Sequence, residues 1–445
     1  MQKILNFREY AIRIIIVVLS FIYLPILFGS ISGDSTLVSY IIAALCFFLL
    51  LILAVGLVLR DGKFVRFYAI SYIVQLALGV AHYLYFVDAG YFAGNGGATS
   101  GFWHEFLTTF TSIEMIHNNW RQLGLLSMVP SDEFYMTHRE IWHIIAYPFY
   151  FFGHKWLNYA PLNAFSSLFA SANLVFIFRN QIDSEKLKYL RNWTAFFPLF
   201  LFNDWMWRDA FGLMLMSVGL VLVYLAKNPI AKFLAFVWFG FGAFIQRTMY
   251  LVLVGGAIGY GYIKKQRNGV LKILSILVSL VILFVLLQFT QETNDEDYNS
   301  MYINSMSFLA LPIKIVFGLI GPFPWVQFFK LVEHNPAFAW QLGDYILGTF
   351  QFGYLLAIIF NYRNISFKNL DVCTFFGFGI MLSGFVTSQM HIGYIAEGLY
   401  FTLPWFFNKV GSVYKRFFNI SLFILVILNV VVLAMGNLSI SSLWK

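Results

Sequence analysis

The chain has few charged residues and almost no cysteine. Asp, Glu, Lys and Arg make up 11% of its 445 residues, whereas a soluble domain has about 25%. A soluble domain of any size is therefore excluded. The two cysteines, Cys46 and Cys373, lie inside apolar segments, so we expect no disulfide framework. The Cys and His spacing typical of a metal site is also absent.

The known catalytic fingerprints are missing too. The sequence has no P-loop, GxSxG, HExxH or dinucleotide-binding pattern. This argues against a cytosolic nucleotide-sugar donor, and we predict neither a cofactor nor a metal. The net charge of +8 does not indicate nucleic acid, because the positions of the basic residues in short loops explain it better.

Long apolar runs recur from one end of the chain to the other, and 60% of all residues are hydrophobic. Many of these runs are long enough to cross a hydrocarbon core of roughly 30 Å. We therefore predict an all-α, polytopic membrane protein with about 11–14 transmembrane helices in a single integral domain, 1–445. The predicted spans are 11–30, 37–59, 67–87, 160–178, 192–204, 208–226, 230–245, 248–263, 271–289, 337–360, 371–389, 391–408 and 417–436.

The charges are distributed unevenly between the two sides of these spans. If the N-terminus is cytoplasmic, 21 of the 29 basic residues fall inside and 16 of the 21 acidic residues fall outside. The positive-inside rule favours this orientation. The two long segments 88–159 and 290–336 then lie outside. We interpret 102–117 as an amphipathic helix on the membrane surface and the aromatic stretch 141–152 as interfacial or re-entrant.

Two polar turns separate short predicted spans on the outer side. The first contains Asp204, Arg208 and Asp209, and the second contains Gln246 and Arg247. Spans of this length can cross where they line a polar cavity. Ionisable groups near membrane depth are functional candidates. We predict that the two turns share one polar surface.

Arg208 and Arg247 are candidate phosphate ligands, because a guanidinium matches phosphate oxygens in a bidentate manner. The alternatives are an ion pair between Arg208 and Asp204 or Asp209, and an Arg247 side chain that reaches to the surface. Asp209 is expected to begin a helix, where its carboxylate favours the N-terminal dipole.

Other candidates lie in the outer loops and a late span. His104 or Glu105 can act as the general base that activates a sugar hydroxyl, although both also suit the polar face of a surface helix. Trp103 and Trp325 can stack on sugars or belong to the aromatic belt. His391 and Glu397 are further catalytic candidates, and a buried Glu397 requires a partner such as an arginine. We treat the other histidines of the first loop, such as His117 and His143, as surface groups.

Three short patches resemble bacterial Wzy-type polymerases of O-antigen and capsule, which have a GT-C-like layout. The patches are Pro198 followed by Trp205 or Trp207 and then Arg208 and Asp209, the segment 321–325 (Gly-Pro-Phe-Pro-Trp), and Trp103 with His104. The chain departs from these families in its late span, where Glu397 stands and an arginine is common.

The resemblance implies an enzyme that polymerises undecaprenyl-pyrophosphate-linked oligosaccharide repeat units on the periplasmic face of the inner membrane. The lipid bilayer and a chain-length regulator protein would be its partners. Two alternatives stay open. One is a GT-C glycosyltransferase with a polyprenyl-monophosphate sugar donor, for which Glu105 would be essential. The other is a transporter of lipid-linked glycans.

Overall fold

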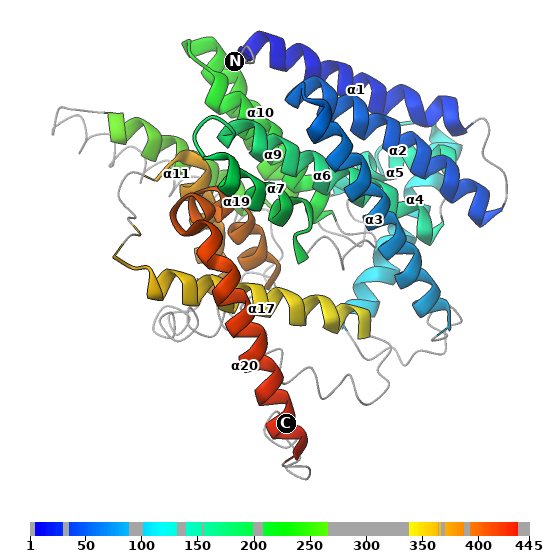
Figure 1. The fold of residues 1–445 in the computed structure, drawn as a ribbon. Coiled ribbons are helices and arrows are strands. Elements are labelled where there is room, and N and C mark those ends of the chain that lie inside the picture. The colour runs from blue at the N-terminus through cyan, green and yellow to red at the C-terminus, as the bar shows by residue number, and fades with distance from the viewer. Residues whose placement is uncertain are drawn as a thin grey trace.

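The computed structural model describes residues 5–29, 35–88, 101–130, 139–153, 155–198, 208–265, 338–363, 365, 370–386 and 392–434. These residues form an all-α fold (Figure 1). Five helices are long and apolar enough to cross a membrane: Phe7–Gly29, Leu37–Leu59, Gly62–Ala81, Tyr159–Phe178 and Pro229–Gln246. The chain is thus a multi-pass membrane protein.

The helices have the following bounds: α1 Phe7–Gly29, α2 Thr36–Leu59, α3 Gly62–Asp88, α4 Gly101–Leu123, α5 Arg139–Phe152, α6 Tyr159–Phe178, α7 Ser184–Ala195, α9 Asp209–Leu225, α10 Pro229–Gln246, α11 Thr248–Lys265, α17 Phe338–Phe360, α18 Val372–Val386, α19 Ile392–Val410 and α20 Tyr414–Ala434.

The observed helices confirm the all-α prediction and correct one predicted span. The segment 192–204 is not one continuous helix, because α7 ends at Ala195 and Phe196 and Phe197 interrupt the helix before Pro198. A residue that precedes proline is sterically pushed out of the helical region. The helix α7 is instead rich in Lys and Arg and begins with an Asp183 cap. The predicted span 271–289 lies outside the described residues.

The helix α6 lies at the centre of the described bundle, and all of its residues are buried. It packs against α9, α2, α7 and α3. Several of its buried side chains are nevertheless polar, and their hydrogen bonds form what we call the α6 seam. Ser167 Oγ donates to Gln75 Oε1 over 3.1 Å, and Ser171 Oγ lies 3.0 Å from the Tyr68 hydroxyl.

The seam continues one turn further along α6. The Tyr10 hydroxyl donates to Asn173 Oδ1 over 3.0 Å, and Asn173 Nδ2 donates to Ser217 Oγ over 3.0 Å. Burial of a polar side chain is costly unless it is hydrogen-bonded. Neutral pairs of this kind therefore allow a helix with polar residues to occupy the centre of the bundle.

The bundle has two chemically different ends. At the basic end, α2 and α6 finish close together, since Arg179 Nη1 donates to the Leu59 carbonyl over 3.0 Å. Lys186 Nζ donates to the Asn408 carbonyl over 3.0 Å at the same end. Helix ends and loops here carry further basic residues, namely Arg60, Lys63, Arg66, Lys188, Lys227, Lys232, Arg363, Lys409, Lys415 and Arg416.

At the opposite end, which we call the site end, α1 and α10 finish and α2, α6, α9, α11 and α19 begin. The helix α5 lies across this end. Its Tyr147 hydroxyl donates to the Ile22 carbonyl of α1 over 3.0 Å, and its Phe152 carbonyl accepts from Ser39 Oγ at the start of α2. At 14 residues, α5 is too short for an ordinary span.

Candidate functional site

Three of the predicted site residues meet at the site end, although they come from distant parts of the sequence. Asp209 is the first residue of α9, Arg247 connects α10 to α11, and Glu397 lies in the second turn of α19. Arg247 Nη2 is 3.6 Å from Asp209 Oδ1 and 3.9 Å from Glu397 Oε1. The two polar turns therefore share one surface, as predicted, and Glu397 has an arginine partner.

Two neutral side chains complete this group. Gln246 Nε2 donates to Asp209 Oδ1 over 2.6 Å and to Glu397 Oε1 over 3.0 Å. The Tyr250 hydroxyl donates to Glu397 Oε2. Gln246, Tyr250 and Glu397 are wholly buried. We call these five residues the Arg247 cluster: Asp209, Gln246, Arg247, Tyr250 and Glu397.

Local backbone geometry sets the cluster in place. Arg208 caps α9, so Asp209 lies in its first turn, where a carboxylate meets the positive end of the helix dipole. Arg247 has an extended backbone between two helices. Its amide donates to the Ala243 carbonyl over 2.9 Å, and its carbonyl accepts from the Tyr250 amide over 2.8 Å. This break turns Arg247 toward α9 and α19.

Glycines allow the helices to approach closely at the cluster. A Cβ atom on Gly212 would lie 2.5 Å from Gln246 Cδ, and one on Gly398 would lie 2.6 Å from the Gly377 carbonyl oxygen. Side chains would overlap at such distances. Gly212 thus leaves room for the Gln246 amide beside α9, and Gly398 holds Glu397 close to α18. Small residues of this kind are typical where membrane helices pack tightly.

The cluster contains more acidic groups than basic ones. Two carboxylates and one guanidinium sum to −1 when all three are ionised, and only Arg247 is partly exposed, with 12% of its side chain accessible. Buried charges are stable only when they are paired and hydrogen-bonded. Both Arg247 distances exceed that of a hydrogen bond. Both contacts are therefore ion pairs without a hydrogen bond between the two named atoms.

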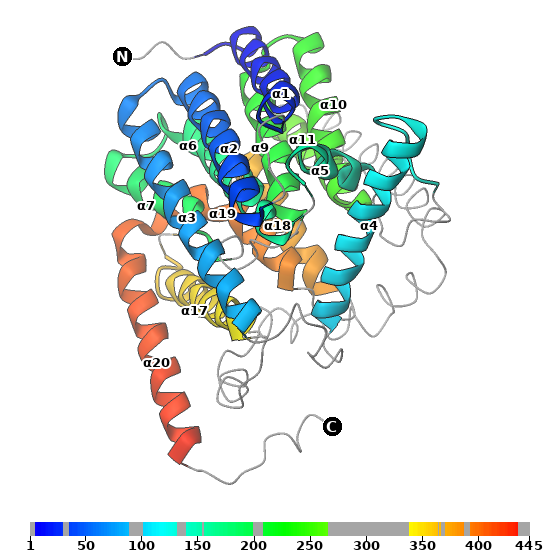
Figure 2. The ribbon, with the colours of Figure 1, turned by 90° about the vertical axis from the view of Figure 1, so that its right-hand side faces the viewer.

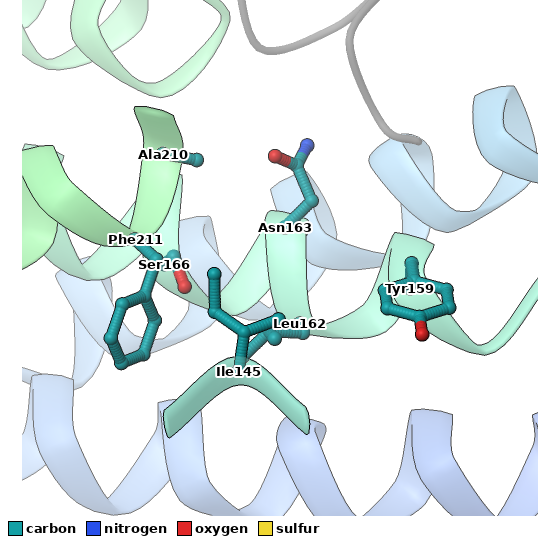
Figure 3. A pocket seen from close by; sticks show the side chains of 7 residues that line it. All are labelled: Ile145, Tyr159, Leu162, Asn163, Ser166, Ala210 and Phe211. Carbon is teal, nitrogen blue, oxygen red and sulfur yellow. The ribbon is translucent and has the colours of Figure 1, made fainter. Parts of the chain in front are cut away.

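A small pocket lies beside the cluster, between α5, α6 and α9 (Figure 3). Asn163 and Ser166 line it from α6, and Ala210 and Phe211 line it from the first turn of α9. The Ser166 hydroxyl is buried and has no hydrogen-bond partner among the described residues. The pocket has room for about one water molecule, so a sugar ring would require α5 or α9 to move.

The structure does not bring every predicted site residue to this place. Arg208 is half-buried at the start of α9, next to the cluster in sequence. Trp103, His104 and Glu105 belong to the first turn of α4, but their side chains are outside the described part of the chain. Asp204, His391 and Trp325 also lie outside the described residues, so their predicted roles stay predictions.

The prediction that His117 and His143 are surface groups is wrong. His117 is 3% exposed and His143 is 7% exposed, because α4 packs against α5. His117 Nε2 donates to the Ala146 carbonyl over 2.9 Å, whereas His143 Nε2 accepts from the Val129 amide over 3.2 Å. Both rings lie beside Trp120. These histidines therefore join α4 to α5.

Sequence reasoning missed Tyr250 and gave Gln246 no specific role. Gln246, Arg247 and Tyr250 occur at spacings of one and three residues across a helix break, and this spacing is a weak signal. No family model, curated protein or solved structure matches this chain. Its function must therefore be argued from its own residues.

Proposed function

We propose that this protein is a glycosyltransferase that polymerises polyprenyl-pyrophosphate-linked oligosaccharide repeat units, as the Wzy-type polymerases do, on the periplasmic face of a bacterial inner membrane. One observation carries the proposal. The Arg247 cluster joins two carboxylates and an arginine at the end of the bundle opposite to the basic end.

Polymerisation needs these two kinds of group. The bond between the donor sugar and its pyrophosphate breaks, and the acceptor hydroxyl oxygen forms the new glycosidic bond. The hydroxyl proton passes to a carboxylate, because a sugar hydroxyl is a poor nucleophile at neutral pH. In our proposal Glu397 or Asp209 accepts that proton. Tyr250 and Gln246 orient Glu397 through their hydrogen bonds.

Arginine would stabilise the leaving pyrophosphate. Arg247 is the most accessible part of the cluster, with 12% of its side chain exposed, and a guanidinium matches phosphate oxygens in a bidentate manner. Arg208 precedes Asp209 and would contribute a second guanidinium. Pyrophosphate is itself an anion, so its charge beside the cluster favours the protonated form of one carboxylate. Proton uptake by the base and departure of pyrophosphate are thus coupled in this scheme.

The test uses the purified protein in liposomes with a lipid-linked repeat unit. We expect longer lipid-linked products and released polyprenyl pyrophosphate. Glu397→Gln should lower the rate by about 10²- to 10⁴-fold. The matched control is Glu114→Gln, which alters an exposed carboxylate of α4 and should leave the rate unchanged. In cells, Arg208→Ala and Arg247→Ala should abolish polymer, and Arg139→Ala should not. Normal polymer in both arginine variants would refute the assignment.

A transporter of lipid-linked glycans is the second candidate. A buried cluster with one excess negative charge is also what a proton-coupled carrier uses inside a membrane. The same liposomes distinguish the two functions. Movement of the labelled lipid-linked sugar across the bilayer without a new glycosidic bond would favour transport. The monophosphate-donor alternative depends on Glu105, and Glu105→Gln tests it in the same assay.

A further inference from the structure

The connection that follows α4 exposes a compact set of apolar side chains. Leu123 is 72% exposed, Leu125 45%, Leu126 66% and Met128 44%. We call these four residues the apolar tip. Single exposed apolar residues are common on protein surfaces, but a contiguous group indicates an interaction site.

The apolar tip is held rigidly by hydrogen bonds. Asn119 Nδ2 donates to the Ser127 carbonyl over 3.0 Å and to Ser127 Oγ over 2.9 Å. The Trp120 indole N–H donates to the same carbonyl over 2.9 Å. Val129, which follows the tip, is buried, and its amide donates to His143. The loop is therefore attached to α4 at one side and to α5 at the other.

The backbone of the tip is strained in one place. Gly124 has φ +99°, which glycine adopts without cost, and Leu126 has φ +73°. A leucine rarely adopts this left-handed conformation. Such strain persists only where the surroundings impose it, and the Ser127 and Val129 hydrogen bonds on the C-terminal side do so here. The result is that the Leu126 side chain points outward from a fixed turn.

The position of the tip indicates what it contacts. Figure 2 shows the C-terminal end of α4 projecting beyond the neighbouring helices. The adjacent helix α5 contacts α1 and α10, whose last turns at the site end also expose apolar side chains: Ile26, Leu27, Phe241 and Phe244. In a multi-pass membrane protein such faces contact lipid.

We propose that the apolar tip inserts into the lipid bilayer at its interface and anchors the α4–α5 unit beside the site end. Arg121, which is exposed two residues before the tip, would lie at the depth of the lipid phosphates. Apolar side chains with an adjacent cation are typical of segments that lie in this interface. The anchor does not depend on the proposed enzymatic activity, because only lipid is required.

The experiment places a fluorophore on the tip of the full-length protein in phosphatidylcholine–phosphatidylglycerol nanodiscs. The two native cysteines are buried and are replaced by alanine. An environment-sensitive dye is attached at Leu123→Cys or, in a second variant, at Met128→Cys. The matched control is Asn118→Cys, an exposed polar position on the same helix. Lipids with a nitroxide near the top of the acyl chain serve as quenchers.

We expect the dye at the tip to have blue-shifted emission and to lose intensity with the nitroxide lipids, whereas the dye at Asn118 responds as it does in water. Emission typical of water at both tip positions would overturn the proposal. Blue-shifted emission without quenching would also overturn it, because protein and not lipid would then cover the tip. Nanodiscs that each hold one protein molecule exclude a second copy as the source of the blue shift.

Discussion

The α6 seam and the Arg247 cluster are both buried polar networks, but the seam consists of neutral side chains and the cluster contains ionisable ones. In the seam, neutral side chains such as Asn173 are satisfied by neutral partners, Tyr10 and Ser217. In the cluster, two carboxylates, Asp209 and Glu397, converge on one guanidinium, that of Arg247. A neutral, saturated network stabilises a fold. A buried network of ionisable side chains costs stability, and such networks are expected at functional sites.

The sharpest test of this contrast is Arg247→Ala. This change leaves two buried carboxylates without their cation, which we expect to lower the free energy of unfolding by about 3–5 kcal/mol. The measurement is thermal denaturation of the protein in nanodiscs, together with the amount of folded protein in the membrane. Arg247→Lys keeps the charge and should recover most of the stability. Equal stability of wild type and Arg247→Ala would mean that the carboxylates are not both ionised.

The close contact between Gly212 of α9 and Gln246 of α10 should give the next largest effect on stability. Gly212→Ala inserts a methyl group where the Gln246 side chain lies, so we expect a loss of about 1–3 kcal/mol and a displaced Gln246. Gly256→Ala is the matched control, because a Cβ there would meet nothing within 4 Å. That variant should be as stable as the wild type or slightly more stable. Parallel thermal melts would show whether the two glycines differ.

The seam predicts loss of stability without loss of activity. Asn173→Ala leaves the buried Tyr10 hydroxyl unpaired and should cost about 1–3 kcal/mol. The double variant with Tyr10→Phe removes the unpaired hydroxyl and should recover part of that cost. The rate per folded molecule should stay at the wild-type value in both, in contrast to Glu397→Gln. A rate defect in Asn173→Ala at unchanged stability would remove the distinction between the two regions.

The smallest expected effect concerns pH. Burial in the α4–α5 contact lowers the pKa of His117 from 6.5 to about 4. The unfolded chain takes up a proton near pH 6.5, whereas the folded one does not until about pH 4. Stability should therefore fall as the pH drops through this window, by about 1 kcal/mol between pH 7.5 and 5.5. Thermal melts at both values would show a smaller drop for His117→Gln.

Apolar length predicted most of this fold, because a membrane span must be a continuous apolar helix. The meeting of Asp209 with Arg247 also followed from the sequence, since both lie in polar turns on the same predicted side. The roles of Gln246 and Tyr250 did not follow, because they depend on how α10, α11 and α19 are rotated about their axes. Close contacts such as that of Gly212 with Gln246 contribute to this rotation, and they are not visible in a sequence pattern.

The break at Phe196 and the burial of His117 were missed for related reasons. Apolar residues continue through 196–202, so hydropathy joined two segments that Pro198 separates. His117 lies on α4, whose polar residues suggested a surface helix, and only contact with α5 revealed a buried face. Tertiary packing decides such cases, and composition does not.

The complete burial of α6 has a consequence for how the protein is made. With a mean hydropathy of 1.4 against 3.2 for α2, and with buried serines and asparagines along its length, this helix is a poor candidate for stable residence among lipid tails on its own. Its most extensive contact is with α9, which follows it in the chain. During synthesis, α6 would therefore leave the insertion machinery before its main packing partner, α9, has been made. Its buried polar face would be covered only after α9 is inserted.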